Sequence, residues 1–89
     1  MDFSFSTETL IQLKKIKQKH PQLFKKIQKQ LKIFKGNIHH TSLRTHKLKG
    51  NLSHTWSISV EGNIRLIYVI KDNKALFLKI GSHDEVYRK

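Results

Sequence analysis

The chain has no cysteine, one proline and only six acidic residues among its 89. Without cysteine it has neither disulfide bridges nor thiolate ligands for a metal. No apolar run approaches the roughly 20 residues that a membrane-spanning helix requires. The first five residues, MDFSF, lack the charged-then-apolar layout of a signal peptide. These absences predict a soluble, cytoplasmic protein that is stabilised by an apolar core rather than by covalent staples.

Most of the charged residues are lysine or arginine. Eighteen Lys and Arg residues give a formal net charge of +12. A solubilising surface would normally carry acidic residues interspersed with the basic ones, so the imbalance favours a polyanionic partner, with nucleic acid first, and binding that depends strongly on salt. A chain of this length has room for one core, which predicts a single domain over residues 1–89.

Hydrophobic periodicity predicts a strand and two helices in the first half of the chain. Phe3 and Phe5 alternate with a serine, as in a short strand. Ser6 or Thr7 is placed to cap a helix that ends near residue 19. Pro21 suits the first position of a second helix, which Gly36 is placed to end as the C′ residue. Both helices carry lysines on their outer faces.

The second half of the chain has strand patterns. A short extended segment is expected over residues 45–49, a half-buried strand over 56–60, a central strand covered on both faces over 64–70, and a further strand over 75–80. Turns are expected at 61–63 and 72–73. The predicted fold class is α+β: an N-terminal strand, a two-helix hairpin, then an antiparallel β-meander, packed as a compact sandwich.

Titratable residues cluster in the last two predicted strands. Arg65 begins the central strand, Lys79 and His83 end the next one, and Tyr87 follows closely. Two cations, an imidazole and a phenol near one sheet edge of a basic chain indicate phosphodiester chemistry. Lys79 lies at i−4 from His83, on the same strand face. These residues also have structural alternatives. His83 could be a surface histidine at a strand end, and Arg65 could form a salt bridge to Glu61 or Asp84. Tyr87 could pack against the sheet at the C-terminus.

The chain resembles the RelE/ParE superfamily of bacterial toxins, and within it the YafQ-like messenger-RNA endonucleases. Three segments carry the resemblance: residues 45–50 (THKLKG), 64–68 (IRLIY) and 81–87 (GSHDEVY). The resemblance implies the toxin of a type II toxin–antitoxin system, a metal-independent endonuclease that cuts the codon in the ribosomal A site. The ribose 2′-hydroxyl attacks phosphorus and the 5′-oxygen leaves.

Roles for individual residues follow from the same resemblance. His83 matches the catalytic C-terminal histidine, with general acid as its expected role. His46 matches the histidine of the His-x-Leu-x-Gly box, as general base or as a group that orients the hydroxyl; a loop histidine bonded to backbone is its alternative. Lys79 stands where the family commonly has arginine, so it supplies charge without a bidentate fork. Arg65 is then the guanidinium available to the phosphorane.

Other positions are candidates for substrate binding or depart from the family pattern. Tyr87 matches an aromatic that stacks on a base, and His54, Lys47 and Lys49 are further candidates for substrate binding. The family's Asp-Trp pair before the central strand is replaced here by Asn63 and Ile64. His54 and Trp56 on the preceding strand could substitute for the pair spatially, although Trp56 is better suited to the core and His54 could equally be an exposed residue at the strand start.

The resemblance also implies partners: an acidic antitoxin, messenger RNA, and ribosomal RNA whose phosphates the helix lysines would contact. No cofactor or metal is expected, since His39 and His40 are adjacent and no zinc-type spacing is present. A different class remains open, namely a non-catalytic ParE-like inhibitor of DNA gyrase. A degenerate toxin that still binds its antitoxin is the third possibility.

Overall fold

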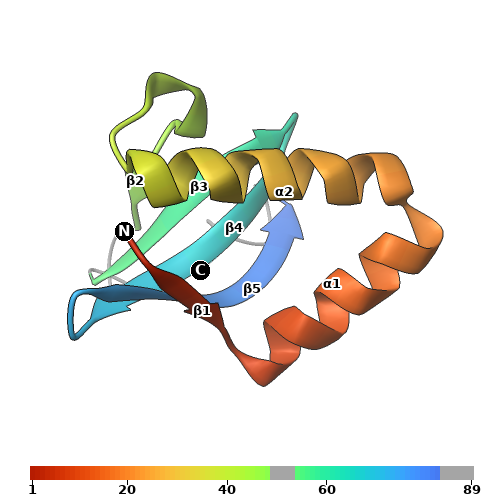
Figure 1. Ribbon diagram of the computed structural model, residues 1–89, viewed down its shortest axis with the longest axis horizontal. Helices are drawn as coiled ribbons and strands as arrows, with labels where there is room; N and C mark the ends of the chain where they lie inside the picture. The colour runs from red at the N-terminus through yellow and green to blue at the C-terminus, as the bar shows by residue number, and fades with distance from the viewer. Residues whose placement is uncertain (49–53, 83–89) are drawn as a thin grey trace.

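The computed structural model describes residues 1–48 and 54–82, and within these ranges the helices and strands follow the predicted order (Figure 1). The elements are β1 (Phe3–Phe5), α1 (Thr7–Lys19), α2 (Pro21–Gly36), the 3₁₀ helix η1 (Thr41–Leu43), β2 (His46–Lys47), β3 (Thr55–Glu61), β4 (Ile64–Lys71) and β5 (Lys74–Ser82). The α+β prediction is confirmed. No helix in the described ranges is long and apolar enough to cross a membrane.

Local capping explains where the two α-helices begin. The Ser6 hydroxyl accepts a hydrogen bond from the backbone N–H of Thr9 at 3.1 Å and thereby caps α1, and Glu8 lies in the first turn. Pro21 begins α2 directly after the cap residue His20. The C-terminal prediction was wrong in detail: Gly36 is the last helical residue, and the extended Asn37 forms the cap.

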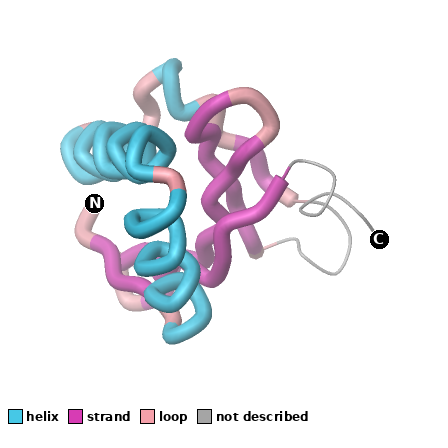
Figure 2. Tube along the Cα trace, turned by 90° about the vertical axis from the view of Figure 1, so that its right-hand side faces the viewer, coloured by secondary structure: helices cyan, strands magenta, loops and turns pink. Residues whose placement is uncertain are grey.

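The strands of the described residues form one mixed sheet in the order β1-β5-β4-β3-β2. The meander prediction holds for β2 to β5, whose pairings are antiparallel. β1 pairs parallel with β5, Phe3 lying opposite Ala75 and Phe5 opposite Phe77. A parallel pairing needs a long crossover connection, which here contains the two helices and the β2–β4 strands. Both helices lie on one side of the sheet (Figure 2).

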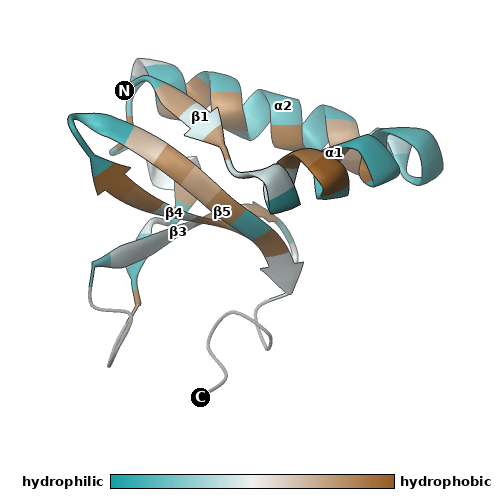
Figure 3. Cartoon of the chain, turned by 90° about the horizontal axis from the view of Figure 1, so that it is seen from below, coloured by the Kyte–Doolittle hydropathy of each residue, from teal (hydrophilic) through white to brown (hydrophobic). Residues whose placement is uncertain are grey.

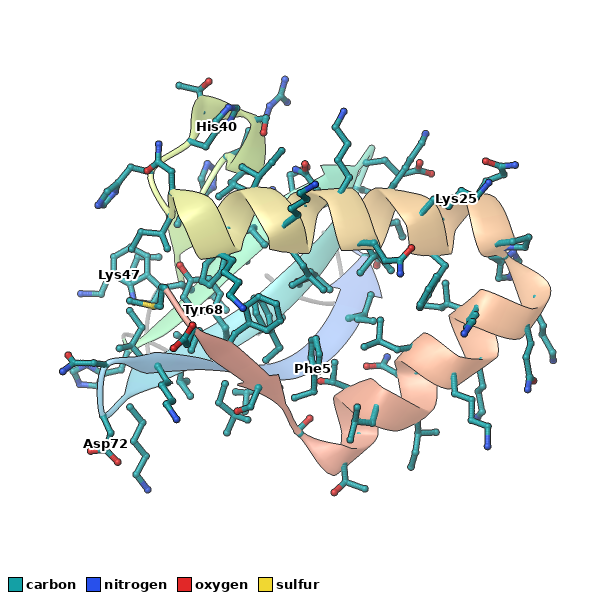
Figure 4. The ribbon with its side chains drawn as sticks, viewed as in Figure 1. Phe5, Lys25, His40, Lys47, Tyr68 and Asp72 are labelled. Atoms are coloured by element: carbon teal, nitrogen blue, oxygen red, sulfur yellow. The ribbon has the colours of Figure 1, made fainter. Side chains whose placement is uncertain are left out.

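The core fills the space between the helices and the sheet. Phe34 of α2, Tyr68 of β4 and Phe77 of β5 form a triangle of rings whose centroids are 5.0, 5.3 and 5.4 Å apart. Phe34 and Phe77 are fully buried, and Figure 4 shows Tyr68 between α2 and the sheet. Lys25 points away from the sheet on the outer side of α2, in keeping with the predicted lysine face.

Two features of the fold differ from expectation. Residues 37–42 have neither a helix nor a strand pattern and are expected to be a loop, yet η1 begins at Thr41, and its last residue Leu43 is fully buried in the core. Ser57, expected on the exposed side of a half-buried strand, is also fully buried. Periodicity assigns serine to solvent because it counts only apolar groups, whereas the Ser57 hydroxyl accepts a hydrogen bond from the buried Arg65 Nε at 2.8 Å.

The core tyrosine gives a testable pH dependence. Burial raises the pKa of Tyr68 from 10.0 to about 12. Since the folded pKa lies above the unfolded one, the stabilisation is complete below pH 10 and is lost as pH rises from 10 towards 12. Tyr68→Phe removes this dependence. The difference in unfolding free energy between wild type and Tyr68→Phe should therefore shift by roughly 2 kcal/mol over that interval.

Urea unfolding at several pH values measures this difference. Lysine titration is common to both proteins and cancels in the comparison. A difference that stays constant from pH 9 to pH 12 would contradict the assignment of the shift to Tyr68.

Candidate active site

The face of the sheet opposite the helices carries a row of residues that includes two of the predicted site residues. Residues directly opposite each other in antiparallel strands share a face. His46 lies opposite Ser57, Ser57 opposite Ile67, and Ile67 opposite Lys79. We call these four residues the cross-sheet row. Its end members His46 and Lys79 are exposed, and three strand spacings place their Cα atoms about 14 Å apart.

Arg65 lies on the same face, in the neighbouring row with Ser59 and Gly81. Only 6% of its surface is exposed. Its Nε donates to the Ser57 hydroxyl at 2.8 Å, and its Nη2 donates to the carbonyl oxygens of Arg44 at 2.5 Å and of Ser57 at 3.3 Å. The guanidinium therefore connects β4 to β3 and to the segment that enters β2.

This arrangement bears on the alternative of a salt bridge at Arg65. The Glu61 carboxylate pairs with Lys26 of α2 at 2.5 Å, and Arg65 bonds the Ser57 hydroxyl and the carbonyl oxygens of Arg44 and Ser57. Asp84 lies outside the described residues. Ser57 went unnoticed as a site residue in the sequence because a buried serine between Trp56 and Ile58 has the same pattern as an exposed one.

His46 is positioned by the residues that precede and follow it. Arg44 has a left-handed backbone, φ 45°, and its carbonyl oxygen faces Arg65. After β2, the N–H of Leu48 donates to the Thr55 carbonyl oxygen at 2.7 Å. The Leu48 side chain packs on Ile67, in the middle of the cross-sheet row. His46 thus lies on an edge strand that is anchored on both sides of it.

A β-bulge decides the face on which Lys79 lies. In β5, Phe77 is opposite Tyr68 while Lys79 is opposite Ile67, so the register shifts between them. Alternation along a regular strand would place residues 77 and 79 on the same face. Here Phe77 and Ile80 are buried in the core, and Lys79 is exposed on the other face. Bulges beside functional sites commonly redirect a side chain in this way.

The other described candidates lie away from the row. Lys47 is opposite Trp56 on the helix side of the sheet, and its Nζ is 5.7 Å from the centre of the indole ring. Figure 4 shows Lys47 at the border of the molecule. Trp56 packs against the core. It therefore does not replace the missing aromatic on the sheet face opposite the helices, which we call the open face because neither α-helix covers it. His54 is exposed in the turn before β3. His83, Tyr87 and Lys49 lie outside the described residues.

The described site has no resemblance to a metal centre. Within residues 1–48 and 54–82, no group of three His, Asp or Glu side chains gathers at metal-binding distance. Around the cross-sheet row, the described residues present the imidazole of His46, the ammonium of Lys79 and an Arg65 side chain that is bonded to protein groups. Such a set suits proton transfer and charge stabilisation at an anionic substrate.

Comparisons with known proteins identify relatives of this fold. Residues 1–88 match the family model described as the bacterial toxin of type II toxin–antitoxin systems, YafQ. No curated protein sequence matches the chain.

Solved structures of toxins share the architecture. YoeB in its heterotetrameric complex with YefM from Staphylococcus aureus is 26% identical, with a TM-score of 0.77 over 93% of this chain and 97% of that one. YafQ in the DinJ–YafQ complex from E. coli is 19% identical, with a TM-score of 0.76 over 97% of both chains. A YoeB/ParE toxin from Agrobacterium tumefaciens is 14% identical, with a TM-score of 0.80 over 93% of this chain and 99% of that one. The last two likenesses concern the fold.

The Arg65–Ser57 contact gives a stability test with a matched control. Ser57→Ala leaves the buried Arg65 Nε without its hydroxyl acceptor, which should lower the unfolding free energy by about 1–3 kcal/mol. Ser59→Ala makes the same change two residues further along the same strand, where the side chain is half-buried, and should cost less. Urea unfolding of the two variants at neutral pH compares them, and equal losses would show that the contact contributes nothing particular.

Proposed function

This chain belongs to the YafQ family of bacterial toxins from type II toxin–antitoxin systems, and from that premise we propose that it is a ribosome-dependent endonuclease that cuts messenger RNA and inhibits translation. The observation that carries the proposal is the cross-sheet row. It places the exposed side chains of His46 and Lys79 on the same face of the sheet, with their Cα atoms about 14 Å apart.

The proposed reaction is transesterification at one phosphodiester. The ribose 2′-oxygen attacks phosphorus, the bond from phosphorus to the 5′-oxygen breaks, and a 2′,3′-cyclic phosphate and a 5′-hydroxyl result. One group must take the 2′-hydroxyl proton and another must protonate the leaving oxygen, and each such group typically contributes 10²–10⁴-fold in rate. Positive charge must meet the phosphorane.

Three side chains are assigned to these tasks. His46 is the candidate general base, or the group that orients the 2′-hydroxyl. Lys79 supplies positive charge to the non-bridging oxygens, as a point charge rather than a fork. His83, in the Gly-Ser-His segment of the family resemblance, is the candidate general acid, and Tyr87 in the same segment would stack on a base.

Arg65 is assigned a supporting role rather than direct contact with phosphate. Its guanidinium is almost fully buried and bonds the Arg44 carbonyl oxygen, two residues before His46. Loss of Arg65 would release the entry into β2, and the His46 imidazole would lose its fixed position. This differs from the sequence-based expectation, in which Arg65 faces the phosphorane directly.

The helix surface supports a polyanionic partner as large as the ribosome. The sequence of the two α-helices contains nine lysines, all exposed, against the single carboxylate of Glu8. These lysines are Lys14, Lys15, Lys17, Lys19, Lys25, Lys26, Lys29, Lys32 and Lys35. Since the helices cover the sheet face opposite the row, ribosomal RNA phosphates would be contacted by one side of the toxin while messenger RNA occupies the other.

The family implies an antitoxin as the second partner. YoeB from S. aureus and YafQ from E. coli were each solved in complex with an antitoxin, YefM and DinJ respectively. For this chain we propose an acidic antitoxin that neutralises part of the +12 charge and covers the open face. Such a segment would order as it binds.

Cleavage assays with single variants test the endonuclease proposal. Reconstituted translation with a defined message, followed by primer extension, should show cuts in the ribosome-bound codon. His46→Ala should lower the single-turnover rate by about 10²-fold or more because it removes a proton-transfer group, and Lys79→Ala by about 10²-fold because it removes a charge at the phosphorane. A 2′-deoxy nucleotide at the scissile position should abolish cleavage.

Two controls match these variants. His39→Ala removes an exposed histidine from a loop, and Lys74→Ala removes an exposed lysine at the other end of β5; both should cleave like wild type. Intact messages with wild-type protein, together with DNA damage in cells that express it, would replace the endonuclease proposal with gyrase inhibition. Cleavage that survives the 2′-deoxy substitution would reject the proposed nucleophile.

The partner proposal is tested by co-expression with the neighbouring reading frame. An acidic small protein should co-purify with the tagged toxin at low salt and block cleavage in a stoichiometric manner. Its affinity should fall steeply as salt rises from about 50 to 200 mM, since the attraction is largely electrostatic. Unchanged cleavage with the neighbouring protein in excess would reject it as the antitoxin.

A further inference from the structure

We infer that Gln12 of α1 is a positioning residue: its side-chain amide holds the β5 bulge that turns Lys79 onto the open face. The Gln12 Nε2 donates to the Ile80 carbonyl oxygen at 2.8 Å, and the Ile80 N–H donates to the Gln12 Oε1 at 2.8 Å. We call these two hydrogen bonds the Gln12 pair. A neighbouring β-strand would bond the main-chain N–H and carbonyl oxygen of Ile80 in the same way, and here a helix side chain takes its place.

The need for such a partner follows from the lengths of the strands. β1 ends at Phe5, opposite Phe77, whereas β5 continues to Ser82. The outer edge of β5 beyond Phe77 would present main-chain groups without a strand beside them. The chain turns into α1 at this point, and α1 follows the edge of β5, as Figure 1 and Figure 3 show.

The first turns of α1 bond the backbone at the bulge itself. The Thr9 hydroxyl donates to the Phe77 carbonyl oxygen at 2.8 Å, and Thr9 is fully buried. The Ser6 hydroxyl donates to the Leu78 carbonyl oxygen at 2.8 Å, and the Ser6 N–H to that of Phe77 at 2.9 Å. Residues on both sides of Lys79 are therefore bonded by α1.

The register of β5 decides on which face of the sheet Lys79 lies. Without the bulge, alternation would place Lys79 on the core face with Phe77, and Ile80 on the open face. The Gln12 pair fixes Ile80 with its side chain in the core, which leaves Lys79 opposite Ile67 in the cross-sheet row. Gln12 thus acts on the site through Lys79, from the far side of β5.

The first experiment needs no catalytic activity. In Gln12→Ala the Ile80 amide should exchange with solvent at least about tenfold faster than in wild type, because its acceptor is gone. The NMR cross-peaks between Ile67 and Lys79 across the strands should weaken. Gln18→Ala, an exposed glutamine on the same helix, should match wild type in both measurements. Unchanged exchange and cross-peaks in Gln12→Ala would overturn the inference.

A second variant covers the case in which Gln12→Ala loosens the whole helix. Gln12→Glu keeps an acceptor for the Ile80 N–H but loses the donor at neutral pH. Below an ordinary Glu pKa of about 4.3 the introduced carboxyl carries a proton and both bonds return. At neutral pH the second carboxylate oxygen faces the Ile80 carbonyl oxygen where the amide donor stood, and the repulsion between the two oxygens should drive the pair apart. Ile80 protection relative to Gln18→Ala should therefore be lower at pH 7 than at pH 3. Equal protection at the two pH values would contradict the Gln12 pair.

The link to Lys79 rests on the proposed endonuclease and is tested by a double-mutant cycle. Gln12→Ala should lower the cleavage rate about tenfold or more with little change in KM, as expected when a catalytic group is misplaced. In the Lys79→Ala background the same change should have no further effect. An equal loss in both backgrounds would show that Gln12 acts by another route. If wild type does not cleave at all, the endonuclease proposal fails while the exchange experiment still decides the role of Gln12.

Discussion

The register of the three long strands is the constraint on which the rest of the structure depends. β3, β4 and β5 place alternate residues on opposite faces, except at the bulge between Phe77 and Lys79 in β5, so the register determines both the core and the site. Tyr68 opposite Phe77 completes the aromatic triangle under α2, and Ile67 opposite Lys79 completes the cross-sheet row. A slip by one residue would exchange these two sets. The core that stabilises the protein is thus also what orients the candidate site.

The sequence predicted the helices and strands well because the apolar residues that face the core between the helices and the sheet recur with a regular period. The Ser6 cap of α1, the start of α2 at Pro21, the two hairpin turns and the central position of β4 all follow from local signals. Asp72 and Asn73, both with positive φ, form the two-residue turn that such residues favour. The parallel pairing of β1 with β5 had no local signal, because it depends on how the helices cross over the sheet.

The open face was less predictable because polar residues determine it. Ser57, Gln12 and Arg65 have buried or half-buried hydrogen bonds, and nothing in the spacing of a serine or glutamine distinguishes such a residue from an exposed one. The bulge at β5 was equally hidden, since Lys79 looked exposed under either register. The clustering of titratable residues supplied Lys79 and Arg65, the family resemblance added His46, and only the structure separates the exposed His46 and Lys79 from the buried Arg65 guanidinium.

These polar contacts stabilise the fold where the composition limits the apolar core. A short chain without cysteine has a limited apolar area to bury, and a hydrogen bond to a buried main-chain carbonyl adds about 1 kcal/mol and fixes geometry as well. Gln30 follows the same pattern, donating to the Ser59 and Ser42 carbonyl oxygens from α2. A lysine in place of arginine at position 79 makes this geometry more important. A flexible ammonium has no fork to orient a phosphate, so its direction must come from the backbone that carries it.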